Sequence, residues 1–174
     1  GDVTLSSLRK NIGVMTQDSF LFGGTIRENL LYGKPESTDE EMMIACKKLG
    51  MEDFILSQKN GYNTDVSQDT LSQGQKQLIA LARTLIADPK ILILDEATSA
   101  IDTRTEELVQ KGMALLMKGR TSFVVAHRLS TIVKADRILV IPNTGIEKEV
   151  SHRELMEKNG LYAALYKAQF EELN

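Results

Sequence analysis

The chain has 174 residues, of which 42% are hydrophobic and 26% are charged, and its formal net charge is −3. This length can bury one sizeable core and is short for two domains, and the acidic balance argues against a nucleic-acid-binding protein, because such proteins carry a basic excess. The single cysteine, Cys46, excludes an intrachain disulfide, and no apolar run approaches the roughly 20 residues that span a bilayer. We expect Cys46 to be a small buried residue on a helix, and the chain, which begins with Gly1, to be a piece of a longer polypeptide.

Strand and helix signals alternate along the first part of the chain. The apolar residues of 11–16 predict a strand that runs into a polar turn. Two capping-box patterns, Thr25-x-x-Glu28 and Thr38-x-x-Glu41, predict the starts of two helices, the second of which should end at Gly50. The segment 52–70 has little periodicity and predicts a short helix followed by a loop.

The helix and strand signals in the sequence become clearer from Ser72 onward. Apolar residues recur at helical spacing over 78–85, which predicts an amphipathic helix that stops at Asp88-Pro89. Four consecutive aliphatic residues, Ile91–Leu94, predict a strand that is covered on both faces of a parallel sheet. Thr103-x-x-Glu106 should cap the next helix.

Two further strands are predicted at 121–126 and 137–141, and Ser151-x-x-Glu154 should open a closing helical region. Helices that alternate with buried strands predict an α/β layered domain. The mostly helical stretch from Thr25 to Ile86 is then predicted to be an insert into this domain.

Two adjacent carboxylates, Asp95 and Glu96, end the predicted strand at 91–94. Ligand-handling groups of open α/β sheets lie at such strand ends. Asp95 can hold hydrated magnesium, and Glu96 can polarise a water for attack on a γ-phosphate. Alternatively, the pair is a helix cap or a solvated surface pair.

Four other polar residues lie just beyond predicted strands or in the loops that these strands feed: Gln17, Ser99, Asp102 and His127. Several loops can therefore converge on one rim. His127 can donate to a phosphate oxygen and Gln17 can offer its amide oxygen to a metal, although a hydrogen-bonded edge histidine and a turn glutamine are the ordinary alternatives. His152 has no comparable context and is expected at the surface.

Ser72 and Gly74 stand at the start of the predicted helix from Ser72. Exposed N–H groups, a hydroxyl and the positive end of the helix dipole suit an anion. The alternative is that Ser72 is only a good N-cap.

Taken together, these segments resemble the nucleotide-binding domain of ATP-binding cassette (ABC) transporters of the exporter type, and the resemblance covers essentially the whole chain. The matching segments, in chain order, are the Q-loop (Val14 to Asp18, followed by Phe20 to Asn29), the signature (Leu71 to Gln75), Walker B (Ile91 to Asp95) with a catalytic glutamate (Glu96), the D-loop (Ser99 to Asp102) and the switch histidine (His127). The implied fold is an α/β, P-loop NTPase-like layered domain with a helical subdomain. The implied divisions are 1–24 (core up to the Q-loop), 25–88 (helical signature subdomain) and 89–174 (remaining core and C-terminal helices).

The resemblance also implies a mechanism. Two such domains face each other head to tail and bind ATP and Mg²⁺ between them, so that Ser72, Gln73, Gly74 and Gln75 act on the partner's nucleotide. The chain's own nucleotide is handled by Glu96, His127, Asp95 and Gln17, the last two as Mg²⁺ ligands, and Asp102 communicates across the interface. The Q-loop region and the helical insert contact a membrane-spanning partner.

The chain departs from this family pattern at several places. No Gly-rich GxxxxGK[ST] loop (Walker A) is present, so the chain by itself should bind ATP poorly and expose apolar surface that an intact domain covers. Gln73 replaces the commoner glycine of the signature. The loop 66–70 looks about two residues short of the family's segment, and Pro142 and Val150 alter the surface near the end of the chain.

The favoured interpretation is an ATP-hydrolysing domain on the cytoplasmic face of the membrane, part of an exporter that moves a lipid or an amphipathic, drug-like compound. A second hypothesis is a truncated, ATPase-inactive fragment that acts only as a binding or regulatory module. A third, a soluble cassette ATPase of DNA repair or translation, is disfavoured by the exporter character of 20–29 and 126–131 and by the lack of a basic stripe.

Overall fold

The computed structural model describes residues 3–16, 19–66, 71–95, 101–126, 129–141 and 147–171. They form two units, Gly1–Val125 and Ala126–Asn174. The first unit contains α1 (Leu5–Asn11), β1 (Ile12–Met15), α2 (Ile26–Leu31), α3 (Asp39–Lys48), α4 (Glu52–Ser57), the 3₁₀ helix η1 (Gly61–Asn63), α5 (Gln73–Ala87), β2 (Ile91–Asp95), α6 (Thr103–Met117) and β3 (Thr121–Val125). The second contains α7 (Leu129–Val133), β4 (Ile138–Val140), β5 (Glu147–Val150), α8 (His152–Glu157) and α9 (Leu161–Glu171).

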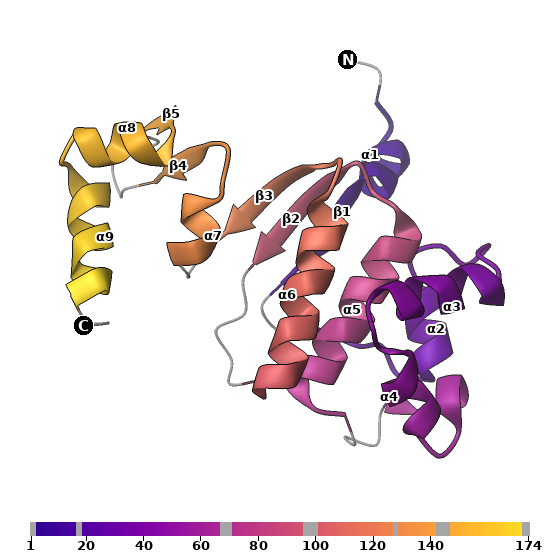
Figure 1. Ribbon diagram of the computed structural model, residues 1–174. Coiled ribbons are helices and arrows are strands. Elements are labelled where there is room, and N and C mark those ends of the chain that lie inside the picture. The colour runs from indigo at the N-terminus through magenta and orange to yellow at the C-terminus, as the bar shows by residue number, and fades with distance from the viewer. Residues whose placement is uncertain are drawn as a thin grey trace. The chain divides into compact units, whose positions relative to one another are not determined.

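The first unit is built on a three-stranded sheet in the order β1-β2-β3, and both strand pairs are parallel (Figure 1). Ile91 on β2 pairs with Ile12 on β1 and with Thr121 on β3. Parallel neighbours need a long crossover connection, and α6 provides it between β2 and β3. The three strands predicted at 11–16, 91–94 and 121–126 are therefore confirmed.

The two faces of this sheet differ sharply. Leu92 and Leu94 of β2 are fully buried, and they share the core with α5 and α6. On the opposite face, Ile93 is 40% exposed, Val14 58%, and Phe123 53%. The prediction that β2 is covered on both faces is thus wrong for this structure, because within the described residues of the first unit a single layer of helices packs on the sheet. The exposed apolar face agrees with the expectation that the chain leaves uncovered surface.

Helix α5 contacts both the sheet and the helices α2 and α3. Its N-cap Ser72 and its third residue Gln75 form a reciprocal capping box, which satisfies two of the helix's leading N–H groups. It ends at Asp88, whose φ of 49° is left-handed, and Pro89 cannot continue the helix. Both ends of the predicted helix are confirmed.

Helices α5 and α6 lie side by side and run in the same direction (Figure 1). Their first turns meet at the buried Gly74, where a Cβ atom would contact the side-chain methyl of Thr105 and lie 2.7 Å from a methyl of Ile101. A bulkier residue cannot be accommodated without movement of α6. The N-cap of α6 is Asp102, whose carboxylate accepts from the N–H of Thr105, and not the predicted Thr103, which is the first helical residue.

The helical layer of α2, α3, α4 and η1 packs on the other side of α5 (Figure 1). The predicted capping boxes at Thr25 and Thr38 are both present. Asn29 of α2 is 1% exposed and folds the preceding segment onto the helix, because its side chain bonds both the N–H and the C=O of Phe22. Cys46 is fully buried as expected, and burial raises the pKa of its thiol to about 11.

The connection from α5 to β2 is held by Arg120, which lies just before β3. Its guanidinium forms an ion pair with Asp88 at 2.6 Å and donates to the carbonyl oxygens of Pro89 and Leu116. The N–H of Lys90 donates to Asn11, at the entry to β1. Each residue of the connection 88–90 is therefore bonded to another part of the unit.

The second unit pairs β4 with β5 in an antiparallel ladder. Ser151 and Glu154 form the predicted capping box at the start of α8. His152 was expected at the surface, but it is half-buried, and its Nδ1 lies 2.7 Å from the hydroxyl of Tyr162 on α9. The tyrosine provides a packing partner that the sequence pattern did not indicate. Among the helices that the structure describes, none is long and apolar enough to cross a membrane.

The contact at Gly74 makes a first prediction. Gly74→Ala should lower the free energy of unfolding by about 1–3 kcal/mol, because the added methyl overpacks the α5–α6 contact. Urea denaturation of the purified chain measures this change. The additional substitution Thr105→Ser removes one of the two obstructing methyl groups and should recover part of the loss.

Gly23 is the matched control, because no atom lies within 4 Å of the position that a Cβ would take there and its φ is not positive. Gly23→Ala should change stability by less than about 0.5 kcal/mol. Equal effects of the two glycine substitutions would contradict the packing explanation.

The exposed face of the sheet makes a second prediction. Phe123→Ser should reduce aggregation of the purified chain, measured by light scattering, because it removes an apolar side chain that is 53% exposed. Leu92→Ser on the buried face should instead abolish the cooperative thermal transition, since it leaves a cavity and a polar group in the core, at a cost of about 3 kcal/mol or more. Undiminished scattering of the Phe123 variant would show that another surface drives association.

Candidate functional site

The carboxyl ends of the three parallel strands lie next to one another. Leu94 pairs with Met15 near the end of β1, and Asp95 pairs with Val125 at the end of β3. Side chains that follow such strand ends are the usual ligand-binding groups of an open α/β sheet. Four predicted site residues that follow these strands lie outside the described residues: Gln17, Glu96, Ser99 and His127.

Asp95, at the end of β2, is a predicted site residue that lies within the described residues. It is half-buried at the end of β2, and alternation along the strand places it on the same face as Ile93, opposite the face that packs on α5 and α6. The described residues contain no cluster of three or more metal-ligating side chains. One carboxylate nevertheless fits Mg²⁺, which is usually held by one or two carboxylates together with phosphate oxygens and water.

The start of α5 presents donors for an anion. The capping box uses the N–H groups of Ser72 and Gln75, at 2.9 and 3.2 Å from their acceptors. The exposed Ser72 hydroxyl keeps its hydrogen for donation, and the N–H of Gln73 has no acceptor among the described residues. Gly74 is itself buried under α6, so its lack of a side chain is accounted for by packing.

The charge of this capping box distinguishes α5 from the other described helices that begin with a capping box. The boxes of α2, α3 and α8 use glutamates, Glu28, Glu41 and Glu154, whereas that of α5 uses the neutral Gln75. A carboxylate at this position would neutralise the positive helix end and repel a phosphate. The amide keeps the cap and leaves the helix end attractive to an anion.

Asp102 lies on the same surface as the start of α5, because its neighbour Ile101 and Thr105 contact Gly74. Its carboxylate is exposed and accepts from the N–H of Thr105 at 3.0 Å. This backbone hydrogen bond lowers the pKa of Asp102 below its usual value, so the group is a stable anion at neutral pH. The structure therefore brings together the described parts of the predicted signature and D-loop.

A second feature, missed by the sequence reasoning, is an aromatic cluster formed by Phe20, Phe22 and Tyr32. The rings of Phe22 and Tyr32 stack at 3.8 Å, and Phe20 meets Phe22 edge-on at 5.2 Å. Phe20 and Tyr32 are 66% and 59% exposed. Arg83 of α5 lies against this cluster, and an arginine in the middle of an otherwise apolar helix face was the signal available in the sequence.

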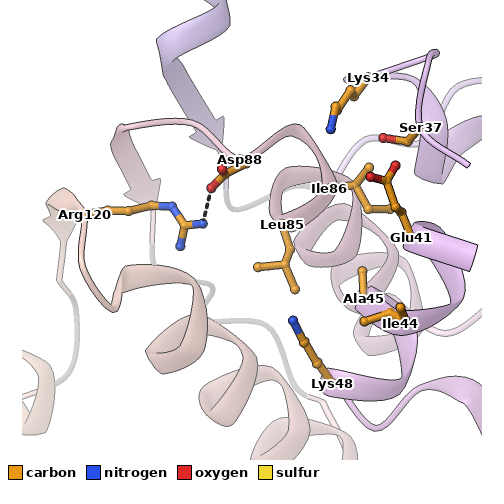
Figure 2. Close-up of a pocket in the computed structure, with 10 residues that line it drawn as sticks. All are labelled: Lys34, Ser37, Glu41, Ile44, Ala45, Lys48, Leu85, Ile86, Asp88 and Arg120. Carbon is orange, nitrogen blue, oxygen red and sulfur yellow. Dashed lines mark hydrogen bonds and ion pairs between the residues drawn. The ribbon is translucent and has the colours of Figure 1, made fainter.

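Two cavities are found among the described residues. The larger, about 340 Å³, is lined by charged and apolar residues from α3, from the turn before it and from the end of α5. Figure 2 shows Lys34 and Lys48 approaching it from opposite sides. Its wall contains the Asp88–Arg120 ion pair and none of the predicted site residues. The smaller, about 290 Å³, is lined by Ser19, Phe20, Leu21, Val66, Gln73 and Lys76, and so adjoins the start of α5.

Comparison with known proteins gives a consistent result. The ABC transporter family profile matches residues 2–99. The Bacillus subtilis protein YfiC, named as an uncharacterized ABC transporter ATP-binding protein, is 51% identical over 171 residues, which are 97% of this chain and 28% of YfiC. A Staphylococcus aureus protein, provisionally named a multidrug export ATP-binding/permease protein, is 47% identical over 170 residues, which cover 97% of this chain and 29% of that protein.

Among solved structures, a bacterial Atm1-family ABC exporter with ATP bound superimposes with a TM-score of 0.84 at 42% identity, covering 96% of this chain and 30% of that one. The chain thus spans less than a third of the length of each of these relatives. The predicted α/β fold of the ABC ATPase type is confirmed. The chain belongs to the ABC transporter family, and it matches the ATP-binding region of the family's exporters.

Proposed function

We propose that the chain is part of an ATP-hydrolysing domain which, paired head to tail with a second such domain, drives export of a lipid or an amphipathic, drug-like compound across a membrane. The observation that carries most weight is the match, over 96% of the chain, to an exporter that was solved with ATP bound. The relative named for multidrug export supports the substrate class.

The geometry of the strand ends supports the roles assigned on the chain's own side. Asp95 would hold Mg²⁺ together with the amide oxygen of Gln17, and the metal would screen the phosphate charges of ATP. Glu96, the next residue in the sequence, would orient and polarise the attacking water. His127 would donate to the γ-phosphate. These groups follow neighbouring strands, as a site at the carboxyl edge of a parallel sheet requires.

The start of α5 supports a role on the partner's nucleotide. The exposed Ser72 hydroxyl and the N–H of Gln73 lie at a positive helix end, where a phosphate is stabilised. Gln75 maintains this end through the capping box, and Gly74 lets α6 approach closely enough to place Asp102 beside it. A signature that acts across a dimer interface would need this exposed position.

The aromatic cluster Phe20–Phe22–Tyr32 supports a contact with the transmembrane part of the exporter. Exposed aromatic side chains are enriched at protein interfaces. The segment 64–66 also lies here, since the N–H of Val66 donates to Gly24 and that of Ile26 to Thr64. The domain would then sit on the cytoplasmic face of the membrane. No observation on the described residues favours the alternative of an inactive regulatory fragment.

A third prediction concerns Glu96. In the intact exporter, Glu96→Gln should abolish phosphate release and leave the ATP-bound dimer intact, because an amide keeps the shape of the side chain but cannot polarise water. Phosphate release and retention of ATP by the dimer are the two measurements. The exposed Glu107→Gln on α6 is the matched control. Substantial remaining hydrolysis would remove Glu96 from its assigned role.

A fourth prediction concerns the neutral capping box. Gln75→Glu should preserve the stability of the domain, since glutamate fills the same position in α2, α3 and α8. The new charge should nevertheless weaken ATP-dependent dimerisation by roughly tenfold or more, because it faces the partner's phosphates at short range.

The control for Gln75→Glu is Gln110→Glu, which makes the same charge change at an exposed position on α6. ATP-dependent dimerisation can be followed by light scattering, and stability by urea denaturation. Dimerisation as tight as in the parent would mean that no phosphate approaches the start of α5.

A further inference from the structure

Arg83 lies on α5 in an unusual setting for a charged side chain. Its Nη2 donates to the carbonyl oxygen of Phe20 at 3.0 Å, and its guanidinium carbon lies 5.4 Å from the centre of the Phe22 ring. Its Nη1 is buried and makes no hydrogen bond with any described residue. One side chain therefore holds both Phe20, through its backbone, and Phe22, through its ring.

Packing alone does not explain this arginine. Burial lowers the pKa of its guanidinium, with only a partly compensating effect from Tyr32, and none of the ion pairs found among the described residues involves it. A methionine or leucine could fill the same space without the cost of desolvating a charge. What arginine adds is a planar group that donates in a fixed direction and stacks on an aromatic face at the same time.

The partners of Arg83 belong to the segment that carries the exposed aromatic rings. Phe22 stacks on Tyr32 of the α2 C-cap, and Asn29 bonds the backbone of Phe22 at 2.8 and 2.9 Å. Helix α2 itself packs directly on α5, and Arg83 adds an attachment for the residues just before it, Phe20 and Phe22. Helix α5 begins at the signature, and Arg83 stands eleven residues after Ser72, which corresponds to roughly 16 Å along the helix axis.

We propose that Arg83 is a positioning residue that makes the exposed aromatic cluster and the start of α5 move as one body, so that motion of the membrane partner reaches the signature through α5. The inference rests on the proposed function, because it assigns a route between two surfaces of the exporter. The guanidinium acts on the backbone of Phe20 and the ring of Phe22 and does not touch nucleotide. Its removal should loosen the segment on α5 and uncouple hydrolysis from transport.

The test uses the full-length exporter, reconstituted in lipid vesicles, with Arg83→Lys and Arg83→Gln. Lysine keeps the charge but cannot donate to Phe20 and stack on Phe22 together. The matched control is Arg27→Lys, because Arg27 lies in the same helical layer and pairs with Asp39 at an exposed site. The first readout is the amount of drug-like compound transported per ATP hydrolysed, since loss of folded protein alone does not move this ratio.

The second readout is amide hydrogen exchange over 20–24, which needs no activity. We expect both Arg83 variants to lower the coupling ratio roughly three- to thirtyfold and to speed exchange in 20–24, and Arg27→Lys to change neither. An unchanged ratio in Arg83→Lys, whether or not exchange is faster, would overturn the proposal. A lower ratio with unchanged exchange would also overturn it, because the effect would then not run through this segment.

Failure of the proposed function would look different. If the unsubstituted exporter shows no ATP-dependent transport, the assignment of the chain as the motor of an exporter is wrong. Unchanged exchange in 20–24 of the Arg83 variants would still overturn the positioning role in that case, and faster exchange would support it. Phe20→Ala separates the contact of the aromatic cluster with the membrane partner from the positioning role of Arg83. It removes the exposed ring of Phe20 and leaves the backbone carbonyl that Arg83 bonds.

Discussion

The contact between the first turns of α5 and α6 is the constraint on which the described site depends. It requires a residue without a side chain at Gly74, because Thr105 and Ile101 fill the space that a Cβ would take. This close approach brings two helix N-termini, capped by Ser72 and Asp102, onto one surface. Gly74 of the signature is thus required for packing. The surface suits an anion because the close packing at Gly74 brings the two helix N-termini together.

Much of the fold could be predicted from the sequence because its signals are local. Capping boxes at Thr25, Thr38 and Ser151 marked helix starts to the residue, since Ser or Thr followed three positions later by Glu satisfies a helix end reciprocally. The predicted cap of α6, Thr103, lies one residue late, because Asp102 and Thr103 are both good capping residues and the Thr-x-x-Glu pattern favours the second. A helix start that is fixed by a reciprocal capping box can be predicted from the sequence. Where two adjacent residues can both cap the helix, the start is harder to predict.

Long-range relations were harder to predict. An aliphatic run such as Ile91–Leu94 has the same sequence whether one or both faces of a sheet are covered, and here Ile93 is exposed while its neighbours are buried. The half-buried His152 depends on Tyr162, ten residues on. Arg83 depends on Phe20, sixty-three residues away. The motif order nevertheless indicated the family, because the family pattern carries these distant relations implicitly.

The Arg120-bonded connection between α5 and β2 has a mechanical consequence. Asp88, Pro89 and Lys90 are each tied, to Arg120 or to the entry of β1, and Gly13 of β1 leaves room for Pro89 where a side chain would collide. The connection 88–90 between α5 and β2 therefore has little freedom to move. Any motion of the helical layer relative to the sheet is therefore resisted at the 88–90 connection, because each of its residues is bonded to Arg120 or to the entry of β1.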